Sequence, residues 1–155
     1  MTNFQKVLAF NKSFKVPTFP SIQPDIWTKH PHLIKLRMEL INEEVQELRD
    51  AVASHDMTET IDALADILYV VYGMAASLGI NADKAFNIVH ESNMSKICTN
   101  EADAQETVRQ YKEDSRYDSP MYEQIGSNQY LVKNASTGKV LKCYKYKPAN
   151  FESLF

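Results

Sequence analysis

The sequence predicts an all-α protein: an antiparallel helical bundle that ends in a small C-terminal β-hairpin or irregular extension. Two observations support this class. Three long segments, residues 31–54, 56–78 and 81–97, carry apolar residues at helical spacing and are separated by short turns. Alternating apolar residues appear only late in the chain, in 129–132 and 139–144. These two runs flank a turn-forming stretch at 134–138, which indicates a hairpin.

Local signals place the ends of the predicted helices. Residues 2–12 favour a short helix, and four prolines from 17 to 31 argue against regular structure in the connection that follows. Pro31 is tolerated in the first turn of the next helix. Asp56 or Thr58 caps the helix that stops at Gly79, and Asn81 caps the one after it. A surface helix is expected around 101–112. We expect a single domain over 1–155, with a helical core at 31–97 and an insertion with the hairpin at 98–155.

Composition limits the classes of function. The chain is 44% hydrophobic and 24% charged, as in soluble globular proteins. Its net charge of −3 and the lack of a basic run argue against a nucleic-acid partner. Two cysteines, Cys98 and Cys143, are expected as reduced thiols in a cytoplasmic protein. The N-terminus lacks a signal-peptide core, and the apolar stretch 64–80 is short and contains Asp66, so we expect a buried helix and no membrane span.

Two groups of carboxylates on the predicted helices are the most informative feature. The first lies in 43–47, and part of it falls within the apolar stripe formed by Leu33, Leu36, Leu40 and Ala51. The second lies on a helix that is apolar nearly all round, at spacings i, i+3 and i+7. A helix of that kind is usually buried. The acids are Glu43, Glu44 and Glu47 in the first group, and Glu59, Asp62 and Asp66 in the second.

Buried carboxylates without compensation are too costly to persist, and a divalent cation is the simplest partner for so many oxygens. Carboxylate oxygens suit Mg²⁺, for which Mn²⁺ is a substitute. The competing interpretation of the first group is an ordinary solvated helix face, because Glu-Glu-x-x-Glu is common. The second group favours the metal site, since Asp66 has no polar neighbour within its stretch.

Several motifs resemble the all-α nucleotide pyrophosphohydrolases, and more narrowly the MazG-like and phosphoribosyl-ATP pyrophosphohydrolase-like group. The resemblance runs from about residue 33 to 96 and resumes near 138. The motifs that carry it are Glu43–Glu47, Asp62–Gly73, His90–Lys96, Gly138–Lys142 and Pro148. It implies Mg²⁺-dependent cleavage of a nucleoside triphosphate between the α- and β-phosphates. It also implies a homodimer or homotetramer with sites at helix-pair or subunit interfaces.

The resemblance also implies roles for individual residues. Glu44, Glu47 and Asp66 are the first-choice metal ligands, and Glu43 or Glu44 orients or deprotonates the attacking water. Ala63 stands where the family usually has a glutamate, so Asp62 or Glu59 takes that place, and the number of metals is open. The residues implied in substrate binding are Asn93 and Lys96, which lie on or beside the inward face of their helix, together with Tyr72, Lys139 and Lys142.

Two alternatives remain at this level. Phosphoribosyl-ATP in histidine biosynthesis is a second substrate, which the stretch 99–128 disfavours because a minimal enzyme of that kind has no obvious counterpart to it. The other alternative is a non-catalytic helical module that binds a nucleotide or cation. Tyr69 and Tyr72 flank the acidic face and could stack on a base, but core packing is the preferred interpretation for either.

Overall fold

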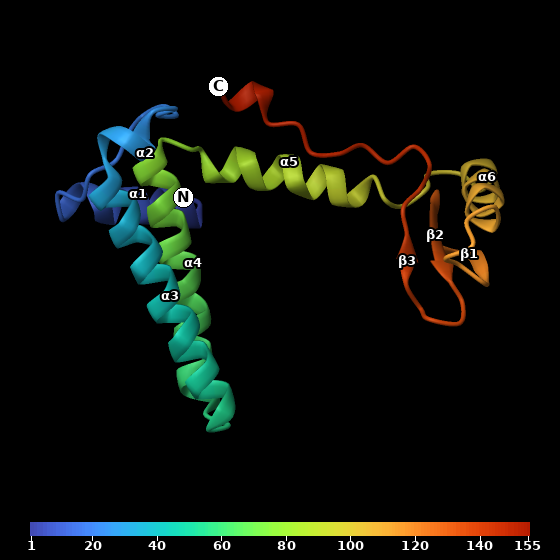
Figure 1. Cartoon of the computed structure of the whole chain (residues 1–155), viewed down its shortest axis with the longest axis horizontal. Coiled ribbons are helices and arrows are strands. Elements are labelled where there is room, and N and C mark those ends of the chain that lie inside the picture. The colour runs from blue at the N-terminus through green and yellow to red at the C-terminus, as the bar shows by residue number, and fades with distance from the viewer. The chain divides into compact units, whose positions relative to one another are not determined.

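The structure is a computed structural model that describes all 155 residues. Its contacts divide the chain into two compact units (Figure 1). Unit 1 comprises residues 1–86 and 151–155, and unit 2 comprises residues 87–150. The single domain expected from the sequence stays a prediction.

Unit 1 is helical and is organised around two long helices, α3 (Pro31–Ala53) and α4 (Met57–Leu78). They are joined by a tight turn, so they run antiparallel and pack along their length (Figure 1). The helix α1 (Asn3–Ser13) packs on α4, and a 3₁₀ turn, Glu152–Leu154, ends the chain. The expectation of no regular structure between 17 and 31 is wrong at one point: α2 (Ile26–Lys29) forms there because Ile26 is buried against the core.

The predicted ends of α4 are confirmed. The Asp56 carboxylate accepts a hydrogen bond from the Glu59 backbone N–H, 3.1 Å away, and caps the first turn. At the other end, Gly79 has φ 74°, a left-handed conformation that glycine adopts without strain. A Cβ atom at Gly79 would lie 1.8 Å from the Ser21 carbonyl oxygen, so this position requires glycine for space as well.

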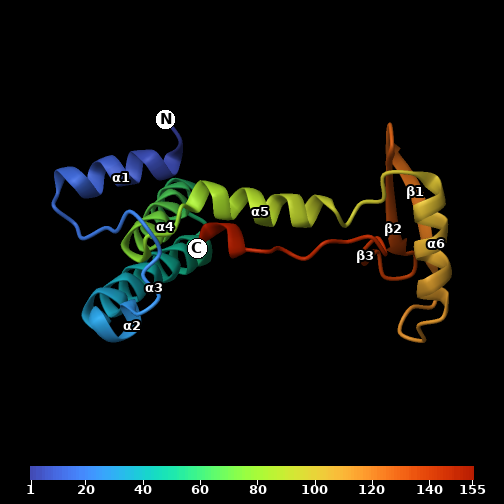
Figure 2. The same cartoon turned by 90° about the horizontal axis from the view of Figure 1, so that it is seen from above.

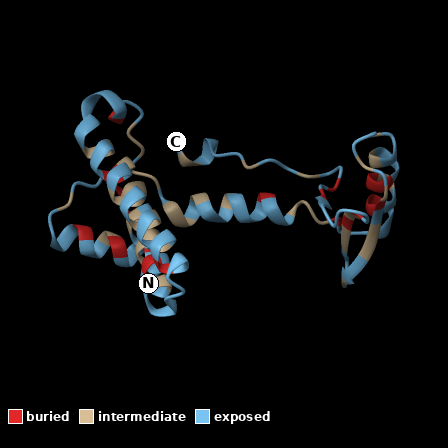
Figure 3. Cartoon of the chain, turned by 60° about the horizontal axis from the view of Figure 1, so that its bottom comes forward, coloured by how far each residue is buried: buried red, intermediate tan, exposed pale blue.

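The expectation that α4 is buried is wrong for the single chain. The residues of α4 that are buried are all small, as close helix packing favours: Ala63, Gly73, Ala76 and Ser77. Four larger residues form an exposed stripe along α4, with 44–61% of each exposed. They are Ile61, Leu64, Leu68 and Val71, called the α4 apolar stripe below. Exposed residues dominate this unit in Figure 3.

Unit 2 is a small α+β structure. The helix α5 (Ala82–Met94) begins in unit 1 and ends in unit 2, and α6 (Glu101–Lys112) follows as predicted. Three antiparallel strands form a sheet of order β1-β2-β3: β1 (Pro120–Gly126), β2 (Gln129–Asn134) and β3 (Val140–Leu141). The β2–β3 hairpin was predicted and β1 was not. Figure 2 shows α6 lying against the sheet, with which it packs through β1 and β2.

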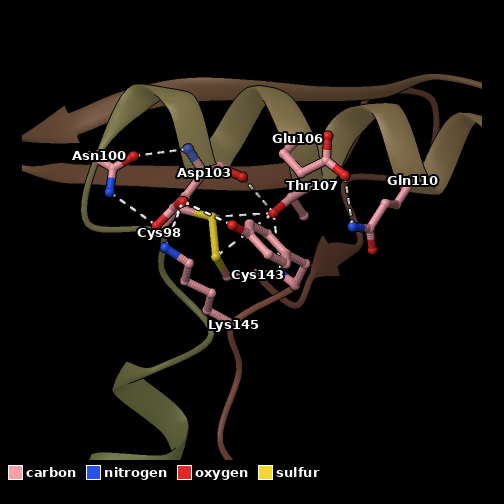
Figure 4. Close-up of polar contacts among 9 residues, drawn as sticks. Cys98, Asn100, Asp103, Glu106, Thr107, Gln110, Cys143 and Lys145 are labelled. Carbon is pink, nitrogen blue, oxygen red and sulfur yellow. Dashed lines mark hydrogen bonds and ion pairs between the residues drawn. A yellow bond between two sulfur atoms is a disulfide. The ribbon is translucent and has the colours of Figure 1, made fainter.

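Unit 2 has its own core, in which the two cysteines are bonded. Cys98 and Cys143 form a disulfide and are 1% and 3% exposed (Figure 4). The expectation of two reduced thiols is therefore wrong, because the tertiary fold brings together residues that lie 45 positions apart in the chain. The Thr107 hydroxyl lies 3.4 Å from one sulfur and 3.7 Å from the other. The rest of this core is apolar: Ala104, Val108, Val132 and Leu141.

Candidate functional site

The antiparallel packing of α3 on α4 brings the two groups of carboxylates together. Glu44 is the partly buried centre of this acidic cluster. Burial raises the pKa of its carboxyl group, and the charges of four neighbouring carboxylates raise it further. These neighbours come from both helices and are Glu47, Asp66, Glu43 and Asp62. The two groups recognised in the sequence thus form one electrostatic unit.

One oxygen of Glu44 has no protein partner. Its Oε2 atom is fully buried and accepts no hydrogen bond. A buried acceptor without a partner costs free energy, and nearby carboxylates add repulsion instead of compensation. No lysine, arginine or histidine forms an ion pair with any member of the acidic cluster. A bound cation would satisfy this atom and the charges around it.

Next to the cluster, the ends of α3 and α4 enclose an open hollow of about 450 Å³. Glu47 and Glu59 line it, together with Asp50. Asp50 was not among the predicted site residues, although it follows Glu47 by three residues on the same helix. Its carboxylate accepts a hydrogen bond of 2.9 Å from the Gln46 side chain. The hollow therefore presents three carboxylates.

The cluster fits a hard divalent cation in its donor chemistry, since it consists of carboxylate oxygens alone and includes an unpartnered buried one. No three acidic, histidine or cysteine side chains in the structure already converge as a ready-made cation site. The residues that would hold the metal are Glu44, Glu47 and Asp66, with Asp62 and Glu59 nearby in sequence. Ala63 is 2% exposed and packs in the helix interface, where it contributes no ligand.

The predicted substrate-binding residues Asn93, Lys96, Lys139 and Lys142 belong to unit 2. The Lys96 ammonium donates a hydrogen bond of 2.7 Å to the Asn93 side-chain oxygen. The expectation that Asn93 faces inward is wrong: it is exposed, because Ser92 occupies the buried face of α5 and bonds Tyr146. Lys142 lies over the Tyr146 ring, 4.6 Å from its centroid.

Two other residues that were predicted to bind substrate, Lys139 and Tyr72, contact side chains of their own unit. The Lys139 ammonium lies 3.3 Å from the Tyr117 hydroxyl. In unit 1, the Tyr72 ring packs against Phe4, with 6.0 Å between the ring centroids. Neither contact tests a role in substrate binding, which stays a prediction for both residues.

A cavity of about 290 Å³ lies between α1, α3 and α4, and its polar residues were missed in the sequence. We call it the Arg37 cavity. Its walls are mainly apolar, but Arg37 and Asn11, which are 7% and 2% exposed, also line it. A signal did exist: Arg37 interrupts the apolar stripe of α3 at the spacing of Leu33 and Leu40. The other lining residues are Val7, Phe10, Val16, Leu33, Leu36, Leu40, Tyr69, Val70 and Gly73.

The fold is mainly helical, with carboxylates gathered around Glu44 between two packed helices. The family model described as phosphoribosyl-ATP pyrophosphohydrolase matches residues 7–93. The chain belongs to this family, within the MazG-like all-α nucleotide pyrophosphohydrolases. The match begins within α1, covers α2, α3, α4 and nearly all of α5, and includes every acid of the cluster. The family supports a nucleotide pyrophosphohydrolase type of activity.

The chain is also similar to an uncharacterized protein, L479, of Acanthamoeba polyphaga mimivirus. The two are 28% identical, and the similarity covers 99% of this chain and 95% of the viral protein. The similarity therefore extends through unit 2, beyond the family match. One helix, α4, is long and apolar enough to cross a membrane, by length and composition only. The family consists of soluble enzymes, however, and α4 carries the carboxylates Glu59, Asp62 and Asp66.

Proposed function

We propose that this protein is a Mg²⁺-dependent nucleoside triphosphate pyrophosphohydrolase, which cleaves a ribo- or deoxyribonucleoside triphosphate to the monophosphate and pyrophosphate. The observation that carries the proposal is the buried, unpartnered oxygen of Glu44 amid four other carboxylates. Family membership supports the same type of reaction. Mn²⁺ is expected to replace Mg²⁺, because both prefer oxygen ligands.

We assign the following roles to residues of the chain. Glu44, Glu47 and Asp66 hold the cation, with Asp62 and Glu59 as further ligands. When bound, Mg²⁺ supplies positive charge that polarises the phosphate oxygens. Glu43 or Glu44 orients the attacking water and accepts its proton. Asn93, Lys96, Lys139 and Lys142, all in unit 2, keep the substrate-binding role that the family resemblance implies, in which the lysines neutralise phosphate charge.

Phosphoribosyl-ATP is the second candidate substrate, because the matching family model carries that description. The reaction would be the same cleavage of an α,β-phosphoanhydride, so the acidic cluster serves both candidates. They differ in the group attached to the base, which a substrate panel resolves.

We also propose that the protein is a homodimer or homotetramer in the cytoplasm. The α4 apolar stripe is the surface that a second copy would cover, since four exposed aliphatic residues on one helix are costly in water. Substituting Leu68 with lysine should lower the molar mass measured by light scattering. An unchanged mass would exclude this stripe from the subunit interface. The cytoplasmic location was expected partly because both cysteines were taken to be reduced thiols. Since they form a disulfide, the proposal of a cytoplasmic location now rests on the proposed activity.

The first test is pyrophosphate release from a panel of NTPs, dNTPs and phosphoribosyl-ATP, with Mg²⁺ and with chelator. Metal-dependent release from an NTP or dNTP is the expected result. Asp66→Asn should abolish turnover and leave the helical circular dichroism unchanged, because it removes a ligand charge without changing shape. Glu39→Gln is the matched control: Glu39 lies on α3, is exposed, and pairs with Lys35 at 3.7 Å.

Turnover retained in Asp66→Asn would contradict the assignment of the cluster. The non-catalytic alternative predicts another pattern, in which Mg²⁺ raises the melting temperature and no substrate is hydrolysed. If the module binds only the cation, nucleotide would add no further stabilisation, since only a ligand bound by the native state shifts unfolding; if it binds nucleotide without hydrolysing it, nucleotide would raise the melting temperature as well.

A further inference from the structure

The Arg37 cavity contains two buried donors without partners. The Asn11 Nδ2 and Arg37 Nη2 atoms are buried and donate no hydrogen bond to the protein. Arg37 forms no ion pair, and burial lowers the pKa of its guanidinium. A buried cation and a buried amide in this state cost free energy, so their presence calls for a compensating group.

The guanidinium of Arg37 is held in place. Its Nε atom donates to the Ser77 hydroxyl at 2.9 Å, and that hydroxyl donates to the Pro17 carbonyl oxygen at 3.0 Å. Gly73 makes room on α4, since a Cβ there would lie 3.1 Å from Arg37 Nη1. These contacts therefore hold the guanidinium in one orientation, while its Nη2 atom has no hydrogen-bond acceptor in the protein. This is expected of a group arranged for a ligand.

The walls of the cavity define the rest of the ligand. They are apolar except for the two donors, and they include the rings of Phe10 and Tyr69, which meet edge to face with centroids 5.5 Å apart. Such walls suit a flat ring. A free phosphate is poorly matched, because its oxygens need more donors than two.

The cavity lies beside the acidic cluster. Leu40 lines it one turn before Glu44 on α3, and Tyr69 lines it three residues after Asp66 on α4. One helical turn is about 5.4 Å, so a nucleotide with its phosphates at the cluster would reach the cavity with its base.

We infer that the Arg37 cavity binds the nucleobase of the substrate, and that Asn11 and Arg37 select bases with ring carbonyl oxygens. The inference rests on the proposed function, which places the triphosphate at the acidic cluster. Both donors require acceptors, and a carbonyl oxygen is the strong acceptor that bases offer. Adenine has no carbonyl oxygen and would leave Arg37 facing weaker ring nitrogens or an amine. The cavity therefore favours uracil, or another carbonyl-bearing base, over adenine.

The test uses non-hydrolysable α,β-imido triphosphates with Mg²⁺ and isothermal titration calorimetry. Two matched pairs replace the only ring carbonyl of a purine with an amine and leave the outline of the base unchanged: guanosine against 2,6-diaminopurine riboside, and inosine against adenosine. Hydrogen bonds to a charged donor are strong, so we expect the carbonyl member to bind about tenfold more tightly or better. Equal affinities within both pairs would overturn the inference.

Two variants test the named residues. Arg37→Met and Asn11→Leu should reduce the preference within a pair to about one. Asn11→Leu should not lower the melting temperature, because it removes an unpartnered amide; a purely structural Asn11 would instead make this variant less stable. Arg49→Met is the matched control, since Arg49 is an exposed arginine on the same helix and does not line the cavity. A preference retained in both cavity variants would overturn the inference.

The outcomes separate the inference from the proposed function. Carbonyl-selective binding without any hydrolysis would refute the hydrolase activity and support the base site. Hydrolysis without a binding preference within either pair would support the hydrolase activity and refute the base site. Failure to bind every analogue would overturn the base site, and the pyrophosphate assay then decides the activity independently.

Discussion

Breaking the Cys98–Cys143 disulfide is expected to destabilise unit 2 and leave unit 1 unchanged. Both cysteines and the loop between them belong to unit 2. The bond joins residues separated by 45 positions. In the chain-entropy description, a crosslink over such a loop restricts the unfolded chain and contributes about 4 kcal/mol to the free energy of unfolding. This is a large share of the stability of a small unit.

The assay is urea unfolding with and without a reductant, followed by a separate probe for each unit. Trp27, the single tryptophan, lies in unit 1 and reports it by fluorescence. Near-ultraviolet circular dichroism in the tyrosine region reports mainly unit 2, which holds six of the eight tyrosines, including Tyr111 and Tyr130 against the core; the part of that transition that does not follow the Trp27 fluorescence is assigned to unit 2. With an m-value of about 2 kcal/mol/M, the loss corresponds to a shift of about 2 M urea in the unit 2 midpoint.

A double variant, Cys98→Ala with Cys143→Ala, is the control. It should unfold like the reduced wild type and be insensitive to the reductant. The fluorescence midpoint of Trp27 should be the same in all samples. If the reductant leaves the unit 2 midpoint of the wild type unchanged, the disulfide does not hold unit 2 together in solution and the reasoning is refuted.

Three further predictions concern stability. In metal-free buffer, Glu44→Gln should raise the melting temperature by about 2–4 °C, because it removes a charge that burial and four neighbouring carboxylates oppose, and a gain of about 1 kcal/mol has this effect in a chain of this size; a lower melting temperature would contradict this account of Glu44. Gly79→Ala should cost about 2 kcal/mol or more in thermal unfolding, since φ is 74° and the added Cβ would clash with Ser21; an unchanged melting temperature would contradict that contact. The Arg109 guanidinium lowers the pKa of Glu106 from 4.5 to about 2. The stability that this pair contributes is therefore present above pH 4.5 and lost as the pH falls to about 2, and an acid titration of Arg109→Gln should lack this loss.

Local features of the sequence determined the helix ends. Asp56 caps α4 and Gly79 ends it, because a short polar side chain and a left-handed glycine act on the backbone within one turn. The range predicted for the surface helix, 101–112, is that of α6, where the Asn100 side chain caps the first turn. The carboxylate groups and the β2–β3 hairpin were likewise visible as local spacing.

Faces and pairings were misjudged where they depend on residues far away in the chain. Helical periodicity predicted that Asn93 faces inward. The buried face of α5 is instead the one that carries Ser92, because Ser92 bonds to Tyr146, which lies 54 positions later in the chain. The strand β1 was missed because its pairing with β2 stabilises it more than its own composition does. The same holds for α4: an all-round apolar helix indicates burial, yet only four small residues of α4 are buried in the single chain.

The sequence by itself determined the helical elements, the two groups of carboxylates and the family resemblance, because each resides in spacing within one segment. Only the tertiary structure decided that the two groups act on one carboxylate, Glu44, and that Cys98 meets Cys143. It also placed Asn11 and Arg37, from different helices, in one cavity with unpartnered donors. The physical reason is that burial and hydrogen-bond satisfaction depend on which segments pack together, and periodicity along one helix carries no information about its partner.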